Sequence, residues 1–159
     1  MQGNDAVIGK LEELLALEWG AVHQYAAHEA AQENWGYERL TKHVSERGAD
    51  ERGHAKKLLD RLVFLGAQPD AARVAAVNAV WGSVPAQLAA DLASEVTAVL
   101  AYRDAIDACN LANDHGSRML LEGILADEEE HVNELEAELA QVQQAGVGPY
   151  LAAQIETKG

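Results

Sequence analysis

The chain has 159 residues, 48% of them hydrophobic, which suffices for one domain with an apolar core, and we predict a single domain over residues 1–159. Its 12 basic and 26 acidic residues give a formal net charge of −14, which argues against a nucleic-acid partner because phosphate neutralisation needs Lys and Arg. The single cysteine, Cys109, excludes an intramolecular disulfide and a Cys-rich metal site, and the lack of a long apolar run or a targeting pattern predicts a cytoplasmic protein with no membrane partner.

Two helices with apolar stripes are predicted in the first half of the chain, from about Asp5 to Gln32 and from near Tyr37 to Leu65. Their apolar residues recur at spacings of three and four, as on one face of a helix. The stripes consist of Val7, Leu11, Leu14, Leu15, Val22 and Tyr25 in the first helix and of Leu40, Val44, Leu58, Leu62 and Leu65 in the second. Glu18 interrupts the first stripe, and Glu51 and His54 interrupt the second.

Residues 67–83 break the helical pattern and are too many for a tight turn between antiparallel helices. Their length predicts a crossover along a bundle, joining two helices that run in the same direction. A third helix is predicted from Ser83, with Pro85 in its first turn, to near Asn113. Its stripe consists of Leu88, Leu92, Val99, Tyr102 and Ile106. Glu95 lies within this stripe.

A fourth helix is predicted from about Ser117 to Ala145, and Gly146, Gly148 and Pro149 are predicted to stop it. Its stripe consists of Leu121, Ile124, Leu125, Val132, Leu135 and Leu139. Glu128 and His131 lie within the stripe, and a short helical tail is predicted from Tyr150 to Ile155. The predicted fold is therefore all-α, an up-down-down-up four-helix bundle with a long crossover and a short fifth C-terminal helix.

Two Glu-x-x-His motifs occur in the chain with matched partners. The motif formed by Glu51 and His54 begins 33 residues after Glu18. A single shift of 77 residues maps this set onto a second one, made up of Glu95, Glu128 and His131. Within each motif, Glu and His project from the same side of a helix. One Glu from each of two helices, with a Glu-x-x-His from each of the other two, forms the ligand set of a dinuclear iron or manganese site in a bundle.

The apolar surroundings of these six residues strengthen the metal prediction. Glutamate is rarely placed on an apolar helix face unless it is paired or bound to metal. Four carboxylates would be neutralised by two divalent cations, and the mixture with imidazole suits iron or manganese, also fits zinc, and does not suit magnesium. We predict that the six residues are both the metal ligands and the catalytic residues, and the alternative is a purely structural set of buried carboxylates.

Two tyrosines lie in phase with the predicted ligands. Tyr25 follows Glu18 by seven residues, and Tyr102 follows Glu95 by seven. Each is a candidate hydrogen-bond donor near the metals, and Tyr25 is also a candidate electron donor. The alternative is a core aromatic residue whose hydroxyl is satisfied elsewhere. The other histidines lack a Glu at the motif spacing and are assigned surface or structural roles: His23, His28, His43 and His115.

Acidic residues also flank both motifs. Glu46 and Asp50 lie one turn apart just before Glu51, and residues 127–130 form an acidic run around the second motif. Glu46 and Asp50 are candidates for guiding ions toward the site or nucleating mineral, and the alternative is a solvated acidic face. In the run 127–130, the residues other than Glu128 are assigned to solvent.

Several further segments carry a family resemblance: Gln24-Tyr25, His28, Asn34-Trp35-Gly36, Arg39-Leu40, the stretches around Asp50-Glu51 and Asp127-Glu128-Glu129, and the tail from Tyr150 to Ile155. On these segments and the six Glu and His positions, the chain resembles the bacterioferritins of the ferritin-like superfamily over essentially its whole length. The resemblance implies that one iron binds Glu18 and His54 and that the other binds Glu95 and His131. It also implies that Glu51 and Glu128 bridge the two irons.

The resemblance further implies an iron-storage function. Bacterioferritins form hollow shells of 24 subunits, oxidise ferrous iron with oxygen or hydrogen peroxide, and store ferric mineral inside. The expected activity is therefore that of a ferroxidase, with ferrous iron and an oxidant as partners and a homo-oligomer of 24 subunits as the assembly. The short fifth helix of the family lines the four-fold channels, and its counterpart here is Pro149 to Ile155.

One position departs from the family. Bacterioferritins ligate haem through a methionine directly after the first bridging Glu, and this chain has Arg52 there. A guanidinium stays protonated and cannot act as a ligand, so we expect that the homo-oligomer binds no haem through two methionines. The chain resembles a subunit type with a complete di-iron site but no haem methionine, which makes a hetero-oligomer with a haem-ligating subunit a further candidate assembly. Glu46 also replaces an inner-surface histidine of the family.

Two other functions remain open on the sequence. One is a di-iron or dimanganese peroxidase or other oxidoreductase of the ferritin-like superfamily, which would form a smaller oligomer and store no mineral. The other is a non-catalytic subunit that only co-assembles, for which an incomplete ligand set would be the signature.

Overall fold

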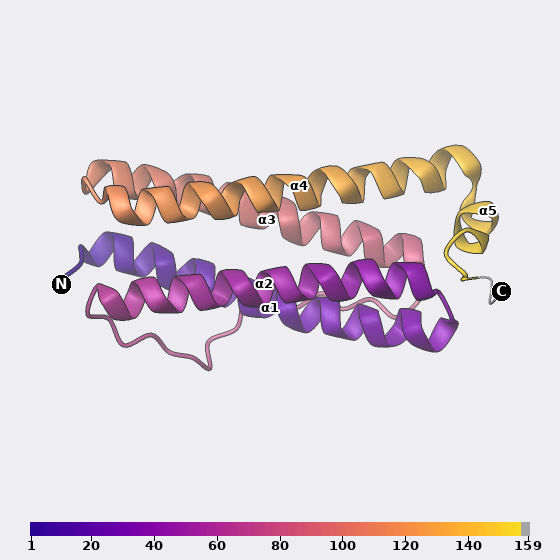
Figure 1. Cartoon of the computed structure of the whole chain (residues 1–159), viewed down its shortest axis with the longest axis horizontal. Helices are drawn as coiled ribbons and strands as arrows, with labels where there is room; N and C mark the ends of the chain where they lie inside the picture. Colours follow the sequence, from indigo (N-terminus) through magenta and orange to yellow (C-terminus); the bar gives the residue numbers. More distant parts are fainter. Residues whose placement is uncertain (157–159) are drawn as a thin grey trace.

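Four long helices lie side by side along the long axis of the molecule, and a short fifth helix lies at one end (Figure 1). The computed structural model describes residues 1–156, and no β-strand occurs among them. The helices are α1 (Asp5–Trp35), α2 (Glu38–Phe64), α3 (Val84–Leu111), α4 (His115–Ala145) and α5 (Val147–Ala152). Because α1 and α4 run in one direction and α2 and α3 in the other, the predicted up-down-down-up bundle is confirmed. The last three residues of the predicted domain, 157–159, lie outside the described residues.

The ends of α1 are set by capping residues. The side chain of Asn4 accepts hydrogen bonds from the backbone N–H groups of Ala6 and Val7, which have no partner inside the helix. At the other end, Gly36 adopts a left-handed conformation with φ 80°, which glycine tolerates without steric cost. The helix therefore continues past the predicted end at Gln32 as far as Trp35, because the cap and not the apolar stripe stops it.

The start of α4 differs from the prediction by two residues. The carboxylate of Asp114 accepts a hydrogen bond of 2.9 Å from the backbone N–H of Ser117, so Asp114 is the N-cap and the helix begins at His115. Ser117, the predicted first residue, lies within the first turn.

The helix α5 also begins and ends earlier than predicted, at Val147 and Ala152. The predicted end of α4 at Ala145 is confirmed, and Gly146, with φ 88°, is the residue that ends it. Gly148 and Pro149, which were also predicted to stop α4, lie within α5. Pro149 lies in the first turn of α5, where a backbone N–H has no partner inside the helix and its absence costs little. The chain therefore turns at Gly146 and enters α5 directly.

The crossover between α2 and α3 runs along the outside of the bundle, as its length predicts (Figure 1). Its backbone is hydrogen-bonded to α1, where the Ala75 N–H donates to the Ala16 carbonyl over 2.9 Å. Gly20 permits this approach, because a Cβ atom at that position would lie 3.3 Å from the Ala75 carbonyl oxygen. The crossover is therefore held against the α1 surface.

Two apolar clusters fill the bundle at opposite ends. The end that holds the start of α1, called here the apolar end, contains Val7, Leu11, Leu14, Leu15, Ala55, Leu58, Leu62, Leu65, Tyr102, Ala105, Cys109, Leu121 and Ile124. The opposite end, called here the polar end, has a smaller cluster of Leu40, Val84, Leu88, Leu135 and Tyr150. Among residues 1–156, no helix has an apolar stretch long enough to cross a membrane.

Candidate metal centre

The six predicted ligands meet in the middle of the bundle. Each of α1 and α3 contributes one glutamate, and each of α2 and α4 contributes a Glu-x-x-His pair. They form two overlapping groups, each with ligand atoms within 4.8 Å of one another: Glu18, Glu51, His54 and Glu128, and Glu51, Glu95, Glu128 and His131. All six side chains are buried, with at most 6% exposure. These six residues are called the metal centre below.

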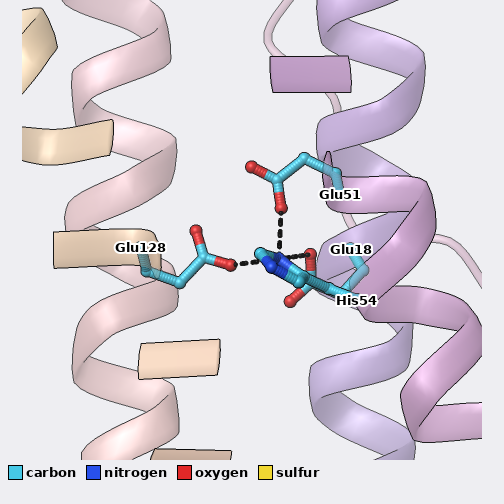
Figure 2. A group of neighbouring side chains, drawn as sticks. All are labelled: Glu18, Glu51, His54 and Glu128. Carbon is cyan, nitrogen blue, oxygen red and sulfur yellow. Dashed lines mark hydrogen bonds and ion pairs between the residues drawn. The ribbon is translucent and has the colours of Figure 1, made fainter. Parts of the chain in front are cut away.

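The first group surrounds the Nδ1 atom of His54 (Figure 2). This nitrogen lies 2.8 Å from Glu128 Oε1 and 3.1 Å from Glu51 Oε2. Glu18 Oε2 lies further away, at 3.8 Å. One imidazole nitrogen and oxygens of three carboxylates, contributed by α1, α2 and α4, therefore surround one point.

The second group repeats this arrangement around the Nδ1 atom of His131. Glu51 Oε1 lies 3.1 Å from this nitrogen, Glu128 Oε2 lies 3.6 Å away, and Glu95 Oε2 lies 3.8 Å away. Glu51 and Glu128 thus each direct one oxygen toward each histidine, while the other two glutamates serve one side only. Two carboxylates are therefore shared between the two groups, and two belong to one group each.

The protein alone leaves buried atoms of the metal centre without hydrogen-bond partners. Among the described residues, Glu51 Oε1, both carboxylate oxygens of Glu128 and His131 Nδ1 form no hydrogen bond. Buried polar atoms without partners cost free energy, and most such atoms in folded proteins are satisfied. Because all of these atoms face the centre, a bound cation is the partner that fits them, and the donor set suits iron or manganese.

The two shared carboxylates, those of Glu51 and Glu128, form ion pairs with the two histidines. Burial opposes charge on His54, but the close carboxylates of Glu128 and Glu51 outweigh it and raise the pKa of His54 to about 10. For His131, the carboxylates likewise outweigh burial and raise the pKa. Burial also opposes ionisation of Glu51 and Glu128, but contacts with the two imidazolium rings lower the pKa of each carboxyl. Two positive rings therefore balance two negative carboxylates.

The terminal glutamates carry the opposite shift. Burial, together with the nearby charges of Glu51 and Glu128, raises the pKa of Glu18 well above its ordinary value. Burial is also the first cause at Glu95, whose pKa is likewise raised well above its ordinary value despite the nearby ring of His131. A proton is therefore bound more tightly at both groups than at an exposed carboxyl, and an incoming cation would compete with it.

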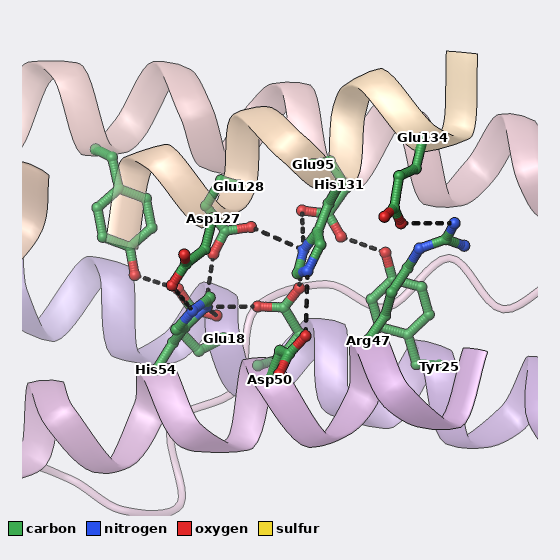
Figure 3. A network of polar contacts seen from close by, with 12 residues as sticks. Glu18, Tyr25, Arg47, Asp50, His54, Glu95, Asp127, Glu128, His131 and Glu134 are labelled. Carbon is green, nitrogen blue, oxygen red and sulfur yellow. Dashed lines mark hydrogen bonds and ion pairs between the residues drawn. The ribbon is translucent and has the colours of Figure 1, made fainter. Parts of the chain in front are cut away.

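The four long helices form two hairpins, α1 with α2 and α3 with α4. Each predicted tyrosine donates a hydrogen bond to a glutamate of the other hairpin. Tyr25, on α1, donates its hydroxyl proton to Glu95 on α3, and Tyr102, on α3, donates to Glu18 on α1. The hydrogen bond from Tyr25 to Glu95 is drawn in Figure 3. These bonds orient the two terminal carboxylates, and they tie α1 to α3 at the level of the metal centre.

Two aspartates flank the histidines on the side away from the centre (Figure 3). Asp127 Oδ2 lies 3.1 Å from His54 Nε2, and Asp50 Oδ2 lies 3.5 Å from His131 Nε2. The assignment of Asp127 to solvent missed this contact. A signal was present in the sequence, because the shift of 77 residues that relates the two ligand sets also maps Asp50 onto Asp127.

Two cavities open toward the metal centre from opposite sides. One, of about 210 Å³, is lined by Gln24 on α1, Asn78 of the crossover, Ser94 on α3 and the four glutamates of the centre. The other, of about 420 Å³, is lined by Glu46, Asp50 and Asp127 among other charged residues, and by His131 of the centre. Glu46 and Asp50 thus lie beside a route to the centre.

The remaining histidines fall into the two predicted classes. His23, His43 and His115 are exposed. His28 is fully buried and structural: its Nε2 accepts a hydrogen bond of 2.8 Å from the backbone N–H of Val80 in the crossover, and its Nδ1 lies 2.9 Å from Asp91 Oδ1.

Arg52 lies on the outer surface of α2, away from the metal centre. It is exposed and lines a shallow cavity with Val22, Ala26, Glu29, Ser45, Gly48 and Ala49. The two methionines of the chain, Met1 and Met119, are both exposed and lie at the N-terminus and on α4.

Sequence comparisons agree with this architecture. The sequence profile of the ferritin-like domain matches residues 8–145. The bacterioferritin of Mycobacterium leprae is 37% identical over 152 residues, which cover 96% of this chain and 95% of that protein. The bacterioferritin of Brucella melitensis is 37% identical, with 87% and 86% covered, and a bacterial ferritin of Synechocystis is 35% identical, with 98% and 99% covered.

Proposed function

Because this chain belongs to the bacterioferritin family of ferritin-like proteins, we propose that it stores iron and that its metal centre oxidises ferrous iron before storage. In this proposal the whole chain, residues 1–159, is one ferritin-like domain. Ferrous iron is the substrate, oxygen or hydrogen peroxide is the oxidant, and the ferric product is stored as mineral inside a hollow shell.

One observation carries the proposal: Glu51 and Glu128 each direct one oxygen toward His54 and the other toward His131. Two ions held by these shared carboxylates would lie side by side. One ion would also bind Glu18 and His54, and the other Glu95 and His131. Each ferrous ion gives up one electron, so a pair can together deliver the two electrons that convert oxygen to peroxide or peroxide to water.

The charge of the centre supports binding of two divalent cations. Four ionised carboxylates would carry four negative charges, which two divalent ions neutralise. Carboxylate ligands also favour the ferric state over the ferrous state, because a hard anionic oxygen stabilises the higher charge. Protons bound by the histidines and by Glu18 and Glu95 would compete with the ions and leave as the ions bind.

Tyr25 is proposed as an electron donor to the metal centre. Its hydroxyl is hydrogen-bonded to Glu95, a proposed ligand, which provides a direct path for the electron and an acceptor for the proton. We expect a tyrosyl radical in the electron paramagnetic resonance spectrum during iron oxidation, and we expect Tyr25→Phe to remove it. Tyr102→Phe is the matched control, since it removes the equivalent bond to Glu18.

The proposed assembly is a homo-oligomer of 24 subunits, with the hetero-oligomer containing a haem-ligating subunit as the second form. In the homo-oligomer we propose that haem is not bound through methionine, because Arg52 occupies the position after Glu51. Protein produced with ample haem should lack the absorption of haem with two methionine ligands. A stoichiometric Soret band of that kind would refute this part of the proposal.

Stopped-flow absorption of metal-free protein mixed with ferrous iron tests the central activity. We expect a fast oxidation phase that saturates at two ferrous ions per subunit, and a particle of several hundred kilodaltons that retains ferric iron. Glu51→Ala and His54→Ala should each abolish the fast phase, whereas Glu136→Ala, an exposed change on α4, should leave it unchanged. Fast oxidation that survives both site variants would overturn the proposal.

A further inference from the structure

We propose that Asp50 and Asp127 are positioning residues, each of which holds one histidine of the metal centre with its Nδ1 atom facing the metal. This inference rests on the proposed function, because it concerns how the same centre binds its ions. Asp127 acts on His54 and Asp50 acts on His131 (Figure 3).

The orientation of the rings carries the first step. In both histidines Nδ1 faces the carboxylates of the centre, while Nε2 faces an aspartate at the rim. An imidazole that binds metal through one nitrogen must keep its proton on the other nitrogen, and a carboxylate that accepts this proton fixes both the tautomer and the ring orientation. The structure therefore assigns Nδ1 as the ligating atom and Nε2–H as the donor to aspartate.

The two contacts connect α2 with α4 in a crossed pattern. Asp127 directly precedes Glu128 on α4 but contacts His54 on α2, and Asp50 directly precedes Glu51 on α2 but contacts His131 on α4. Successive residues of a helix point about 100° apart, so a bridging glutamate can face the centre while the preceding aspartate faces its rim. The same helical turn thus supplies a bridging ligand and a support for the histidine opposite.

An ordinary surface ion pair does not explain this arrangement well. Both aspartate side chains are exposed, Asp127 at 50% and Asp50 at 62%. Exposed ion pairs contribute little to stability. The partners, however, are buried histidines that occur in two copies related by the 77-residue shift, and both copies are contacted at Nε2. The contact of 3.1 Å at Asp127 is shorter than the one of 3.5 Å at Asp50, so the effect should be greater at Asp127.

Titration of the metal-free protein with Co²⁺, followed by visible absorption and calorimetry, tests the assignment without relying on iron oxidation. We expect two ions per subunit in the parent. Asp127→Asn should lower the Co²⁺ affinity of one of the two sites by about 10- to 100-fold, the usual effect of losing such a support. The affinity of the other site should remain almost unchanged. Asp50→Asn should lower the Co²⁺ affinity of the other site by a smaller factor. Glu130→Gln is the matched control, because it removes the same charge from an exposed site on α4 beside the same cavity.

Two further backgrounds separate positioning from a change in overall charge. In His54→Ala, which removes the partner of Asp127, the added Asp127→Asn change should have no further effect on Co²⁺ affinity. In His131→Ala, which retains that partner, the added Asp127→Asn change should lower the affinity for the remaining Co²⁺ ion as much as it does in the parent. Equal weakening of both ions by Asp127→Asn, or an effect no larger than that of Glu130→Gln, would overturn the inference while two-ion binding by the parent still supports the metal centre. A parent that binds no Co²⁺ would overturn the metal centre and the inference together.

Discussion

The two ends of the bundle hold the four helices together in different ways. At the apolar end the buried residues are hydrophobic apart from Ser117, and they include Leu58 and Leu62 on α2. At the polar end the interior also contains polar and charged side chains: Gln24, His28, Gln32, Arg47, Gln87 and Asp91. The metal centre lies between these ends, so two similar ligand sets are held in unlike surroundings.

The difference follows the path of the crossover. At the polar end, Gln24 Oε1 accepts a hydrogen bond from the backbone N–H of Asn78, and His28 Nε2 accepts one from the backbone N–H of Val80. The Gln87 side-chain amide donates a hydrogen bond to the Val80 carbonyl. A backbone segment outside regular structure needs partners for its polar groups, and buried side chains supply them here. The 77-residue shift maps Gln24 and His28 onto alanines, because the second hairpin has no crossover to hold. Ligand symmetry therefore does not extend to the residues that support the ligands.

The largest expected effect comes from opening a cavity at the apolar end. Leu58→Ala removes a fully buried side chain, and we expect it to lower the free energy of unfolding by about 2–5 kcal/mol. Urea unfolding of the metal-free protein measures the change. Leu111→Ala is the control, since Leu111 is 88% exposed and its truncation should have little effect. A cost for Leu58→Ala as small as that of the control would contradict the description of this end.

A smaller effect is expected at the polar end. His28→Ala leaves the Val80 N–H without a partner and removes one of the two contacts of the buried Asp91 carboxylate, which keeps its hydrogen bond from Gln24. The change should cost about 1–3 kcal/mol. Hydrogen exchange at the Val80 amide should become faster, because the crossover loses this anchor. His23→Ala, an exposed change on the same helix, should leave exchange at Val80 as it is. Unchanged exchange in His28→Ala would mean that the crossover is held by other contacts.

The metal centre itself should make stability depend on pH. The pKa of His54 is about 10 in the folded protein and about 6.5 when unperturbed, so folding favours the protonated ring. This stabilisation is present in full below pH 6.5 and is lost as the pH rises to about 10. The melting temperature of metal-free protein should therefore fall over this range, while Co²⁺ binding should strengthen as the protons leave. A metal-free melting temperature that rises between pH 6.5 and 10 would contradict the charge pattern of the centre.

The smallest expected effect is at the surface where the crossover touches α1. Gly20→Ala places a methyl group 3.3 Å from the Ala75 carbonyl oxygen, a tight contact that must shift the crossover slightly. A gain in helix propensity of about 1 kcal/mol opposes this strain, so the net change should be below about 1 kcal/mol. Gly53→Ala on α2, where a Cβ would contact nothing within 4 Å, should be more stable than Gly20→Ala. The reverse order in thermal unfolding would contradict this packing of the crossover.

Most of the fold could be predicted from the sequence because helix phase is a local property. The apolar spacing predicted the four long helices, and the long irregular stretch predicted the crossover. Errors occurred at the ends, where single capping groups decide: Asp114 starts α4 two residues earlier than predicted, and Gly146 alone separates α4 from α5. The buried Arg47 was also missed, since its partners Glu134 and Glu138 lie on α4 and their proximity depends on packing.

Helix periodicity establishes which side chains share a helical face, and it was enough to propose Glu18, Glu51, His54 and their counterparts as one ligand set. Which atoms meet across helices follows from the packing of the helices against one another. Tyr25 contacts Glu95 and not Glu18 on its own helix, and Asp127 contacts His54 and not His131. Such pairings depend on the rotation and axial offset of each helix against its neighbours. Those quantities are set by the packing of residues far apart in the chain, which a periodic pattern within one helix does not encode.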